Sequence, residues 1–351
     1  MRKLIAIIIL LFAINSYGAD ILYIAPFGGS FNGYAEQLLD GLKLSLNSQL
    51  TIETANSNDN LTKVLESKKS YVVVGPFFEQ AAKVVIDQLC NKNILVILPF
   101  YKPKKVCGNV VFYGYDPLAA ARQLSEKICS INSGRIAVFY SFGKLYKKER
   151  DIFLSSLSYC NKEAEYVEAI PSFINLIDSF VKDFFGVEEV KKVAGITKGR
   201  VFRYTNHIDT LIIFAPQKVV VQILNLLDYY DIYPEDVLSV DEEVDSDLLK
   251  LRRSAIRHFG FVTPYYLCDN NNFVENYRQT YFSDPTFASA LGYDIGKFIN
   301  FYLSGGKIDN YTDRNMLIGR LLFFDDRNWS VMTYKFVNYR QVRRCLKELS
   351  K

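Results

Sequence analysis

Short apolar segments rich in β-branched and aromatic residues alternate along this chain with longer segments of helical spacing. Ile21–Pro26 is followed, after a break at Gly28-Gly29-Ser30, by Tyr34–Leu46, and the same order continues from Tyr71–Val74 to Ile94–Leu98. Apolar strands that alternate with amphipathic helices are typical of a parallel sheet with helices on both faces. This pattern restricts the chain to the α/β class.

The alternation starts again further along. A break at Tyr115-Asp116-Pro117 separates a strand expected at Val110–Tyr113 from a helix expected at Leu118–Ile128, and further pairs follow. At ~150 residues per domain, a chain of this length can build two lobes with their own cores. The last part of the chain leaves this order and predicts a closing hairpin around Asp325-Asp326-Arg327-Asn328.

We therefore expect an α/β fold with two doubly wound parallel-sheet lobes joined by a multi-crossover hinge. The expected first lobe is 19–116 with 263–312, and the expected second lobe is 117–262 with 313–351.

The first residues have the layout of a secretory signal peptide. Arg2-Lys3 precede an apolar run, Leu4–Ile14, and the small residues Ser16 and Gly18 follow it. The run is too short to cross a bilayer as a helix, so we expect export, with 1–18 removed after Gly18. No cysteine lies near the cut, so lipid attachment is not expected. A buried N-terminal strand and an uncleaved anchor are the alternatives.

Charge and histidine content argue against several function classes. Lys and Arg number 42 and Asp and Glu 38, for a net charge of +4, and no basic run is concentrated enough to predict a nucleic-acid partner. The two histidines, His207 and His258, lie far apart, and no Gly-x-Ser-x-Gly or His-Glu-x-x-His motif occurs. Gly28–Gly33 lacks the central glycine of a dinucleotide-binding loop. We expect a non-catalytic protein without a cofactor.

Several motifs, in this order and spacing, are similar to those of one known family. They are Ile24-Ala25-Pro26-Phe27-Gly28-Gly29-Ser30 with Tyr34 and Gly41-Leu42-Lys43-Leu44, then Val72–Pro76, Ile94–Pro99, Arg135–Tyr140 and Ala290-Leu291-Gly292-Tyr293-Asp294. With them, the mature chain resembles type I periplasmic solute-binding proteins of the leucine/isoleucine/valine-binding kind. That resemblance implies a periplasmic protein that captures a small ligand, an amino acid or similar, between two lobes and delivers it to an ABC permease.

A second stretch resembles one branch of the same superfamily more closely. Arg203–Pro216, Ile223–Asp231 and the inserted segment Gly186–Arg200 are similar to the corresponding parts of penicillin-binding-protein activators. This resemblance implies an alternative function: an envelope interaction protein that regulates peptidoglycan synthesis through a synthase partner.

The expected ligand-binding residues follow the strands. In an open α/β sheet, ligands bind beyond the carboxyl ends of the strands, where helix N-termini also point. The candidates are Gly29, Ser30, Phe31, Tyr34, Phe77, Phe78, Glu79, Phe100 and Tyr101 in the first lobe, and Phe142, Tyr146, Gln217, Asp241 and Glu242 in the second. The alternatives are ordinary strand-to-helix turns, packing among the aromatic rings, and a solvated acidic loop. The charged residues Lys144, Lys147, Lys148, Glu149 and Arg150 are interpreted as a solvated helix start.

Six cysteines in an exported chain favour disulfides over metal ligation, and no Cys-x-x-Cys pair occurs, so no metal site is expected. Sequence alone leaves fifteen connectivities open. In the two-lobe arrangement, Cys90 and Cys107 precede neighbouring strands, and Cys129 and Cys160 repeat that relation. The hypothesis is therefore the pairs Cys90–Cys107, Cys129–Cys160 and Cys268–Cys345, which assigns the cysteines to stability.

Overall fold

The computed structural model describes 19–103, 107–190, 201–241, 248, 251–269, 271–308, 311, 316–324, 327–332, 335–338, 341 and 344. These residues form two compact units. The first contains the described residues up to Tyr115 and those of Asp269–Thr333, and the second contains those of Asp116–Cys268 and Tyr334–Lys351. The chain therefore passes from one unit to the other three times.

The first unit is built on a sheet with the order β13-β14-β5-β4-β3-β1-β2. Its strands are β1 (Ile21–Ala25), β2 (Ile52–Asn56), β3 (Val72–Val74), β4 (Leu95–Leu98), β5 (Val110–Phe112), β13 (Gly319–Phe324) and β14 (Arg327–Met332). The strands β2-β1-β3-β4-β5 are all parallel. This is one of the two common doubly wound orders, and its direction of winding changes between β1 and β3.

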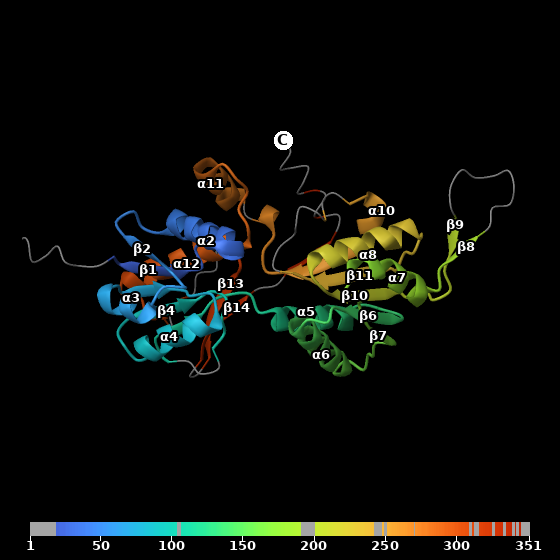
Figure 1. The fold of residues 1–351 in the computed structure, drawn as a ribbon, viewed down its shortest axis with the longest axis horizontal. Coiled ribbons are helices and arrows are strands. Elements are labelled where there is room, and N and C mark those ends of the chain that lie inside the picture. The colour runs from blue at the N-terminus through green and yellow to red at the C-terminus, as the bar shows by residue number, and fades with distance from the viewer. Residues whose placement is uncertain are drawn as a thin grey trace, which may run out of the picture. The chain divides into compact units, whose positions relative to one another are not determined.

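Helices cover both faces of this sheet (Figure 1). They are α2 (Asn32–Ser45), α3 (Leu61–Ser67), α4 (Glu79–Leu89) and α12 (Phe287–Leu303). A further helix, α11 (Asn271–Tyr281), packs against α2. Leu22 and Ile24 of β1 pack with α3 and α4 in one apolar core. Because side chains alternate along a strand, Tyr23 points to the other face, where its hydroxyl donates to the Ala35 carbonyl of α2 at 2.7 Å.

The helices α2 and α12 meet at glycines. A Cβ atom on Gly41 would lie 1.9 Å from the Ser289 carbonyl oxygen, and one on Gly292 would lie 2.0 Å from that of Leu38. Only glycine permits backbones to approach this closely. Within α12, the buried Asp294 accepts hydrogen bonds from the Tyr113 hydroxyl and from the backbone of Leu317 and Ile318. These contacts tie the returning segment to the unit's core.

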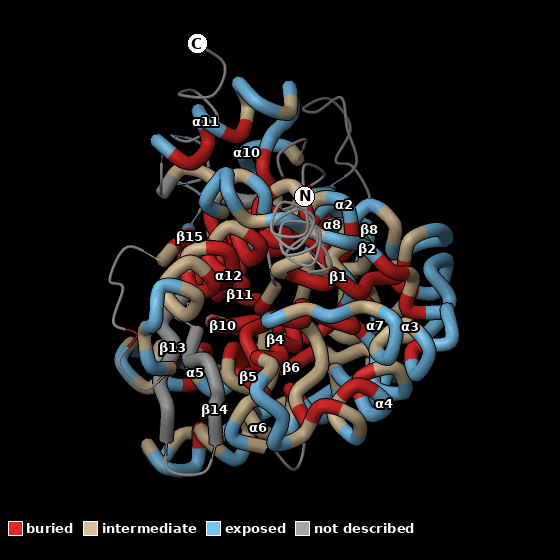
Figure 2. The backbone as a smooth tube through the Cα atoms, turned by 90° about the vertical axis from the view of Figure 1, so that its left-hand side faces the viewer, coloured by how far each residue is buried: buried red, intermediate tan, exposed pale blue. Residues whose placement is uncertain are grey.

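The second unit repeats the plan with the sheet order β15-β12-β11-β10-β6-β7. Its strands are β6 (Ile136–Tyr140), β7 (Tyr166–Ala169), β10 (Thr210–Phe214), β11 (Asp236–Val240), β12 (Phe259–Thr263) and β15 (Lys335–Asn338). Its helices are α5 (Pro117–Cys129), α6 (Lys144–Ser158), α7 (Ile177–Phe185), α8 (Gln217–Tyr229) and α10 (Arg253–Ile256). Short 3₁₀ helices occur at Gly29–Phe31, Ile174–Leu176 and Leu267–Asp269. Figure 2 shows that the central strands of both sheets are buried.

A separate two-stranded ribbon belongs to the second unit. The strands β8 (Glu188–Val190) and β9 (Val201–Arg203) pair antiparallel between α7 and β10. The sequence predicts Gly186–Arg200 to be an inserted segment, and the ribbon forms a sheet separate from the main one.

The doubly wound α/β prediction is confirmed, but the end of the chain differs from the expectation. The predicted hairpin forms between β13 and β14, yet it does not belong to the second unit as the 313–351 boundary implied. Instead, β14 pairs parallel to β5 and so covers the open edge of the first sheet. Only β15 joins the second sheet, antiparallel to β12.

The boundary expected near 263 also shifts. The strand β12 extends to Thr263, and the Tyr266 hydroxyl donates to the Gln341 carbonyl within the second unit. The chain returns to the first unit at Asp269.

Two predicted disulfides are confirmed, each within one unit. Cys90 and Cys107 are bonded with Cα atoms 5.5 Å apart, and Cys129 and Cys160 with Cα atoms 5.8 Å apart. Both pairs lie near the amino ends of parallel strands, as the fold prediction required. Cys268 is also disulfide-bonded, while its expected partner Cys345 lies outside the described residues.

Two other expectations fall outside the described residues: the signal segment 1–18 and the candidate ligand residue Glu242. Among the helices that the structure describes, none has the length and apolar character needed to cross a membrane.

Candidate functional site

The candidate site lies at the carboxyl edge of the first sheet. The order β2-β1-β3-β4 places the loops after β1 and β3 beside each other at the point where the winding direction changes. Ligands of doubly wound proteins bind at this switch point. The β3 loop approaches closely: Gly75 has φ +94°, and a Cβ atom there would lie 2.0 Å from the Ile24 carbonyl oxygen. A side chain at this position would separate the two loops.

Aromatic rings from three loops and one helix gather at this edge. Phe77 and Phe100 have ring centroids 4.6 Å apart, Tyr34 and Phe100 6.0 Å, and Phe31 and Phe78 5.1 Å, all in edge-to-face geometry. We call these five residues the aromatic edge cluster. Edge-to-face pairs add to the stabilisation that ring burial supplies.

The cluster has a buried part and an open part. Phe77 is only 5% exposed and its ring lies 6.4 Å from that of the buried Tyr23. Phe31 and Phe78 are 48% and 42% exposed. Burial raises the pKa of the Tyr23 phenol far above its ordinary value, so the hydroxyl stays a hydrogen-bond donor to α2. Phe77 and Tyr23 are thus packed in the interior, and the exposed pair presents apolar surface.

The remaining candidates of the first unit are arranged differently. Gly29 and Ser30 lie in an exposed 3₁₀ turn that leads into α2, and the Gly28 amide donates to Asn32 Oδ1 at 2.8 Å. Glu79 opens α4 and forms an exposed ion pair with Lys83. Tyr101 packs against the α3–α4 core rather than with the five rings. The structure thus brings five of the nine candidates together as rings.

The carboxyl edge of the second unit carries an acidic group. The pKa of Tyr146 is raised by its own burial and then by the negative charges of Glu149 and Asp241. Burial, followed by the charge of Asp241, raises the pKa of Glu149 to about 8. Glu149 is 3% exposed, and its Oε2 has no hydrogen-bond partner among the described residues. Phe142, in contrast, is 53% exposed, and Gln217 is the first residue of α8.

The prediction that Lys144–Arg150 is a solvated helix start is wrong for Glu149. This residue shares one helical face with the buried Phe153 and Leu157, at a spacing of four residues. That four-residue spacing could have indicated from the sequence that Glu149 is buried. Arg150 lies with its guanidinium carbon 4.2 Å from the Tyr140 ring centroid.

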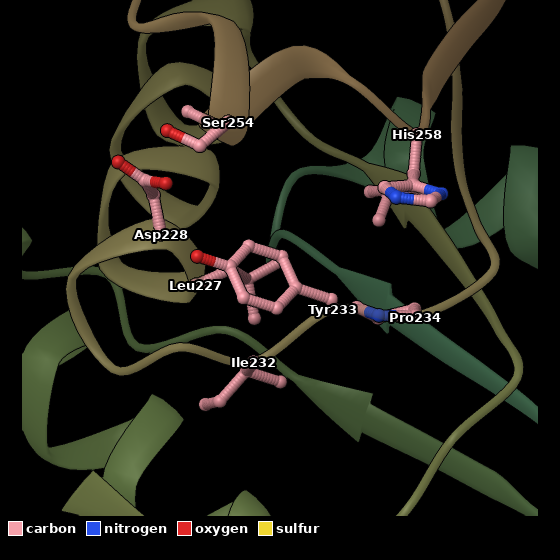
Figure 3. Close-up of a pocket in the computed structure, with 9 residues that line it drawn as sticks. Leu227, Asp228, Ile232, Tyr233, Pro234, Ser254 and His258 are labelled. Carbon is pink, nitrogen blue, oxygen red and sulfur yellow. The ribbon is translucent and has the colours of Figure 1, made fainter.

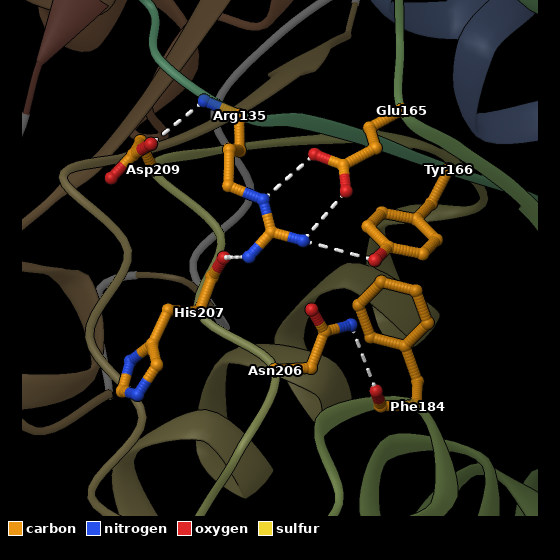
Figure 4. A network of polar contacts seen from close by, with 7 residues as sticks. All are labelled: Arg135, Glu165, Tyr166, Phe184, Asn206, His207 and Asp209. Atoms are coloured by element: carbon orange, nitrogen blue, oxygen red, sulfur yellow. Dashed lines mark hydrogen bonds and ion pairs between the residues drawn. The ribbon is translucent and has the colours of Figure 1, made fainter.

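A polar network at the opposite, amino edge of the second sheet is structural. The Arg135 guanidinium donates two 2.7 Å bonds to the Glu165 carboxylate and one to the His207 carbonyl (Figure 4). Asp209 accepts from the Arg135 backbone amide. These bonds tie together the starts of β6, β7 and β10. His207 contributes its carbonyl here, and its ring packs against Tyr204.

A small cavity lies near the second histidine, also at the amino edge. Figure 3 shows Leu227, Ile232, Tyr233, Pro234 and His258 around it. Its volume of about 10 Å³ is close to the least that one water molecule needs. The cavity is therefore too small for a ligand. The His258 ring is held at this edge, with its Nδ1 atom 3.0 Å from the Glu235 carbonyl oxygen.

No protein-family model and no curated protein matches the chain. Solved structures do match. Full-length LpoA from Haemophilus influenzae aligns with 94% of this chain at 14% identity and a TM-score of 0.65. Its C-domain, described as a regulator of PBP1A, aligns with 91% at 13% identity and a TM-score of 0.63. The chain spans 59% of full-length LpoA and 96% of its C-domain.

Binding proteins of amino-acid transport match equally well. A Rhodospirillum rubrum protein assigned to branched-chain amino acid ABC transport aligns with 91% of this chain and 97% of its own, at 13% identity and a TM-score of 0.70. The substrate-binding protein LivJ from Streptococcus pneumoniae, in complex with isoleucine, aligns with 92% of this chain and 96% of its own, at 14% identity and a TM-score of 0.59. The chain has the type I periplasmic binding protein fold.

Proposed function

We propose that the chain is an exported, non-catalytic binding protein that captures a small ligand with an apolar or aromatic part for ABC-type uptake. The aromatic edge cluster carries this proposal. It lies at the switch point of the first sheet, and its exposed pair Phe31 and Phe78 offers apolar surface where this fold class places its ligands.

The cluster also indicates the chemistry of the ligand. Rings fill the loops where the leucine-binding family, which the sequence resembles, uses hydroxyl groups and free amides to hold a carboxylate. Among the five ring residues, only Tyr34 carries a hydroxyl. The 14-residue helix α2 begins next to Phe31 and directs its positive end to the same edge. A branched or aromatic carboxylate fits both features, because its apolar part would contact the rings and its charge would face the helix.

Two of the similar solved structures support a role in transport, because both are proteins of branched-chain amino acid transport. This chain aligns with more than nine tenths of the length of each.

A second candidate function is regulation of a peptidoglycan synthase, as for LpoA. The ribbon β8–β9 favours it, because it is an addition to the doubly wound plan and presents Val190 and Val201 at 43% and 42% exposure. Exposed apolar side chains on a ribbon outside the main sheet suit contact with another protein.

A thermal-shift screen of 19–351 distinguishes the two. Apolar and aromatic amino acids, aromatic carboxylates, short peptides and muropeptides are the probes. A ligand at 100 times its dissociation constant stabilises the folded chain by about 2.7 kcal/mol. A shift with a carboxylate or amino acid supports uptake. Absence of any shift, together with retention of a purified peptidoglycan synthase on immobilised chain, would contradict uptake and support the second function.

A further inference from the structure

The apolar surface of the aromatic edge cluster continues into an open pocket of the first unit. Phe78, whose ring lies 5.1 Å from that of Phe31, is also part of the lining of this pocket, which has a volume of about 330 Å³. The loop after β2 and the start of α3 form one wall, and the first half of α4 forms the other. A ligand that covers Phe78 therefore has room to extend along α4.

The wall on α4 is an apolar strip. Phe78, Ala81 and Val84 recur every three residues, and all three line the pocket. Phe78 and Val84 are 42% and 37% exposed, so the strip is open to a molecule that enters the pocket. With a rise of about 1.5 Å per residue, the strip is about 9 Å long. This length matches a chain of roughly six to eight carbons, with bonds of about 1.5 Å.

The charges around the pocket indicate how a carboxylate would lie. Asp59 is the only charged residue of the lining, and its negative charge disfavours an anion inside the pocket. The positive end of α2 lies at the other end of the exposed ring pair, because this helix begins directly after Phe31. A carboxylate group at α2 leaves the uncharged end of the same molecule to cross Phe31 and Phe78 and to enter the pocket.

We propose that the ligand is an elongated carboxylate whose unbranched apolar chain lies on Phe78, Ala81 and Val84. This inference rests on the proposed function, because it keeps the charged end of the ligand at the aromatic edge cluster. It narrows the ligand class of that function to carboxylates with a chain of medium length. Ala81 and Val84, which are not among the candidates predicted from the sequence, then set the preference for chain length.

Isothermal titration of 19–351 with butanoate, hexanoate and octanoate tests this preference. Affinity should rise about 2- to 4-fold for each methylene group that the pocket covers, so octanoate should bind at least about tenfold more tightly than butanoate. In ¹⁵N-labelled protein, octanoate should shift the backbone amides of 80–84, and butanoate should leave them in place.

Two variants and a control assign the gain in affinity to α4. Ala81→Leu places a larger side chain in the pocket, and Val84→Gln makes the far end of the strip polar. Each should reduce the preference for octanoate over butanoate at least about threefold. Leucine and glutamine are both good helix formers, so α4 should be kept. Gln88→Ala, on the same helix outside the pocket, is the matched control and should keep the wild-type preference.

The outcomes separate this inference from the proposed function. Equal affinity for the three carboxylates, or a wild-type preference in both Ala81→Leu and Val84→Gln, overturns the chain site while the carboxylate site stands. If none of these carboxylates and none of the probes of the thermal-shift screen binds, the proposed function is contradicted, and the chain site is rejected with it.

Discussion

Phe31 and Phe78 meet edge to face with ring centroids 5.1 Å apart and ring planes at 76°, while about half of each side chain stays exposed. The first follows β1 and the second follows β3, so the pair exists only because these strands are neighbours in the sheet. Phe77, the residue before Phe78, is buried, and its ring contacts those of Phe100 and Tyr23. One cluster therefore serves two purposes, a packed support and an exposed surface, and these purposes can be separated by mutation.

The buried ring should carry most of the cluster's stability. We expect Phe77→Ala to lower the free energy of unfolding by about 3–5 kcal/mol, as for other buried phenylalanines. Phe31→Ala should lower it by less than about 1 kcal/mol, because half of that ring is already in water. Urea denaturation followed by circular dichroism measures both. Equal losses for the two variants would show that the buried and exposed parts do not differ as described.

Glu149 should make the protein less stable as the pH rises. Its folded-state pKa of about 8 exceeds the ordinary value of 4.5, so its contribution is fully present below about pH 4.5. Between about pH 5 and 8 the unfolded chain loses the proton while the folded chain keeps it, and stability falls by up to about 1.4 kcal/mol per pH unit.

The comparison with Glu149→Gln isolates this effect from that of Asp294, whose pKa is also raised by burial, to about 7. The stability advantage of the variant over the wild type should grow by more than about 1 kcal/mol from pH 5 to pH 8. Denaturant midpoints at several pH values give this difference. An advantage that stays constant with pH would mean that Glu149 is ionised in the folded chain.

The glycines of the α2–α12 contact should not tolerate a methyl group. Gly41→Ala places a Cβ atom 1.9 Å from a backbone oxygen, so the helices must move apart, and we expect a loss of at least about 1–3 kcal/mol. Gly33 lies in the same helix with no atom within 4 Å of a built Cβ. Gly33→Ala should stabilise by up to about 1 kcal/mol through helix propensity. Thermal unfolding of both variants checks this, and a neutral Gly41→Ala would refute the close approach.

Much of the fold followed from local pattern. Breaks such as Gly28-Gly29 and Gly75-Pro76, with the periodicity between them, located the strands and helices of both units. Two disulfides of the hypothesis were confirmed, because the expected parallel strands place Cys90 and Cys107, and likewise Cys129 and Cys160, at the same edge of a sheet. Pattern of this kind is encoded within a few residues, so a single sequence shows it.

The pairing of strands that are far apart in the sequence could not be predicted from local pattern. Nothing local in 319–332 distinguishes a hairpin that extends the first sheet from one that extends the second, because the deciding contact is the open edge of β5. The same holds for the sites. The five rings come from three loops and one helix that are far apart in the sequence, and only the folded sheet brings them together. Glu149 is an exception, because its spacing of four residues from Phe153 could have indicated from the sequence that it is buried.

The most direct test of the central claim is the affinity of Phe31→Asp for the carboxylate or amino acid that stabilises the wild type most in the thermal-shift screen. Isothermal titration of the wild type, Phe31→Asp and the control Gln88→Ala measures it. We predict that the wild type and the control bind alike and that Phe31→Asp loses at least about tenfold, 1.4 kcal/mol, because a carboxylate then stands on the apolar surface. Equal affinity of all three proteins would contradict the assignment of the aromatic edge cluster as the ligand site.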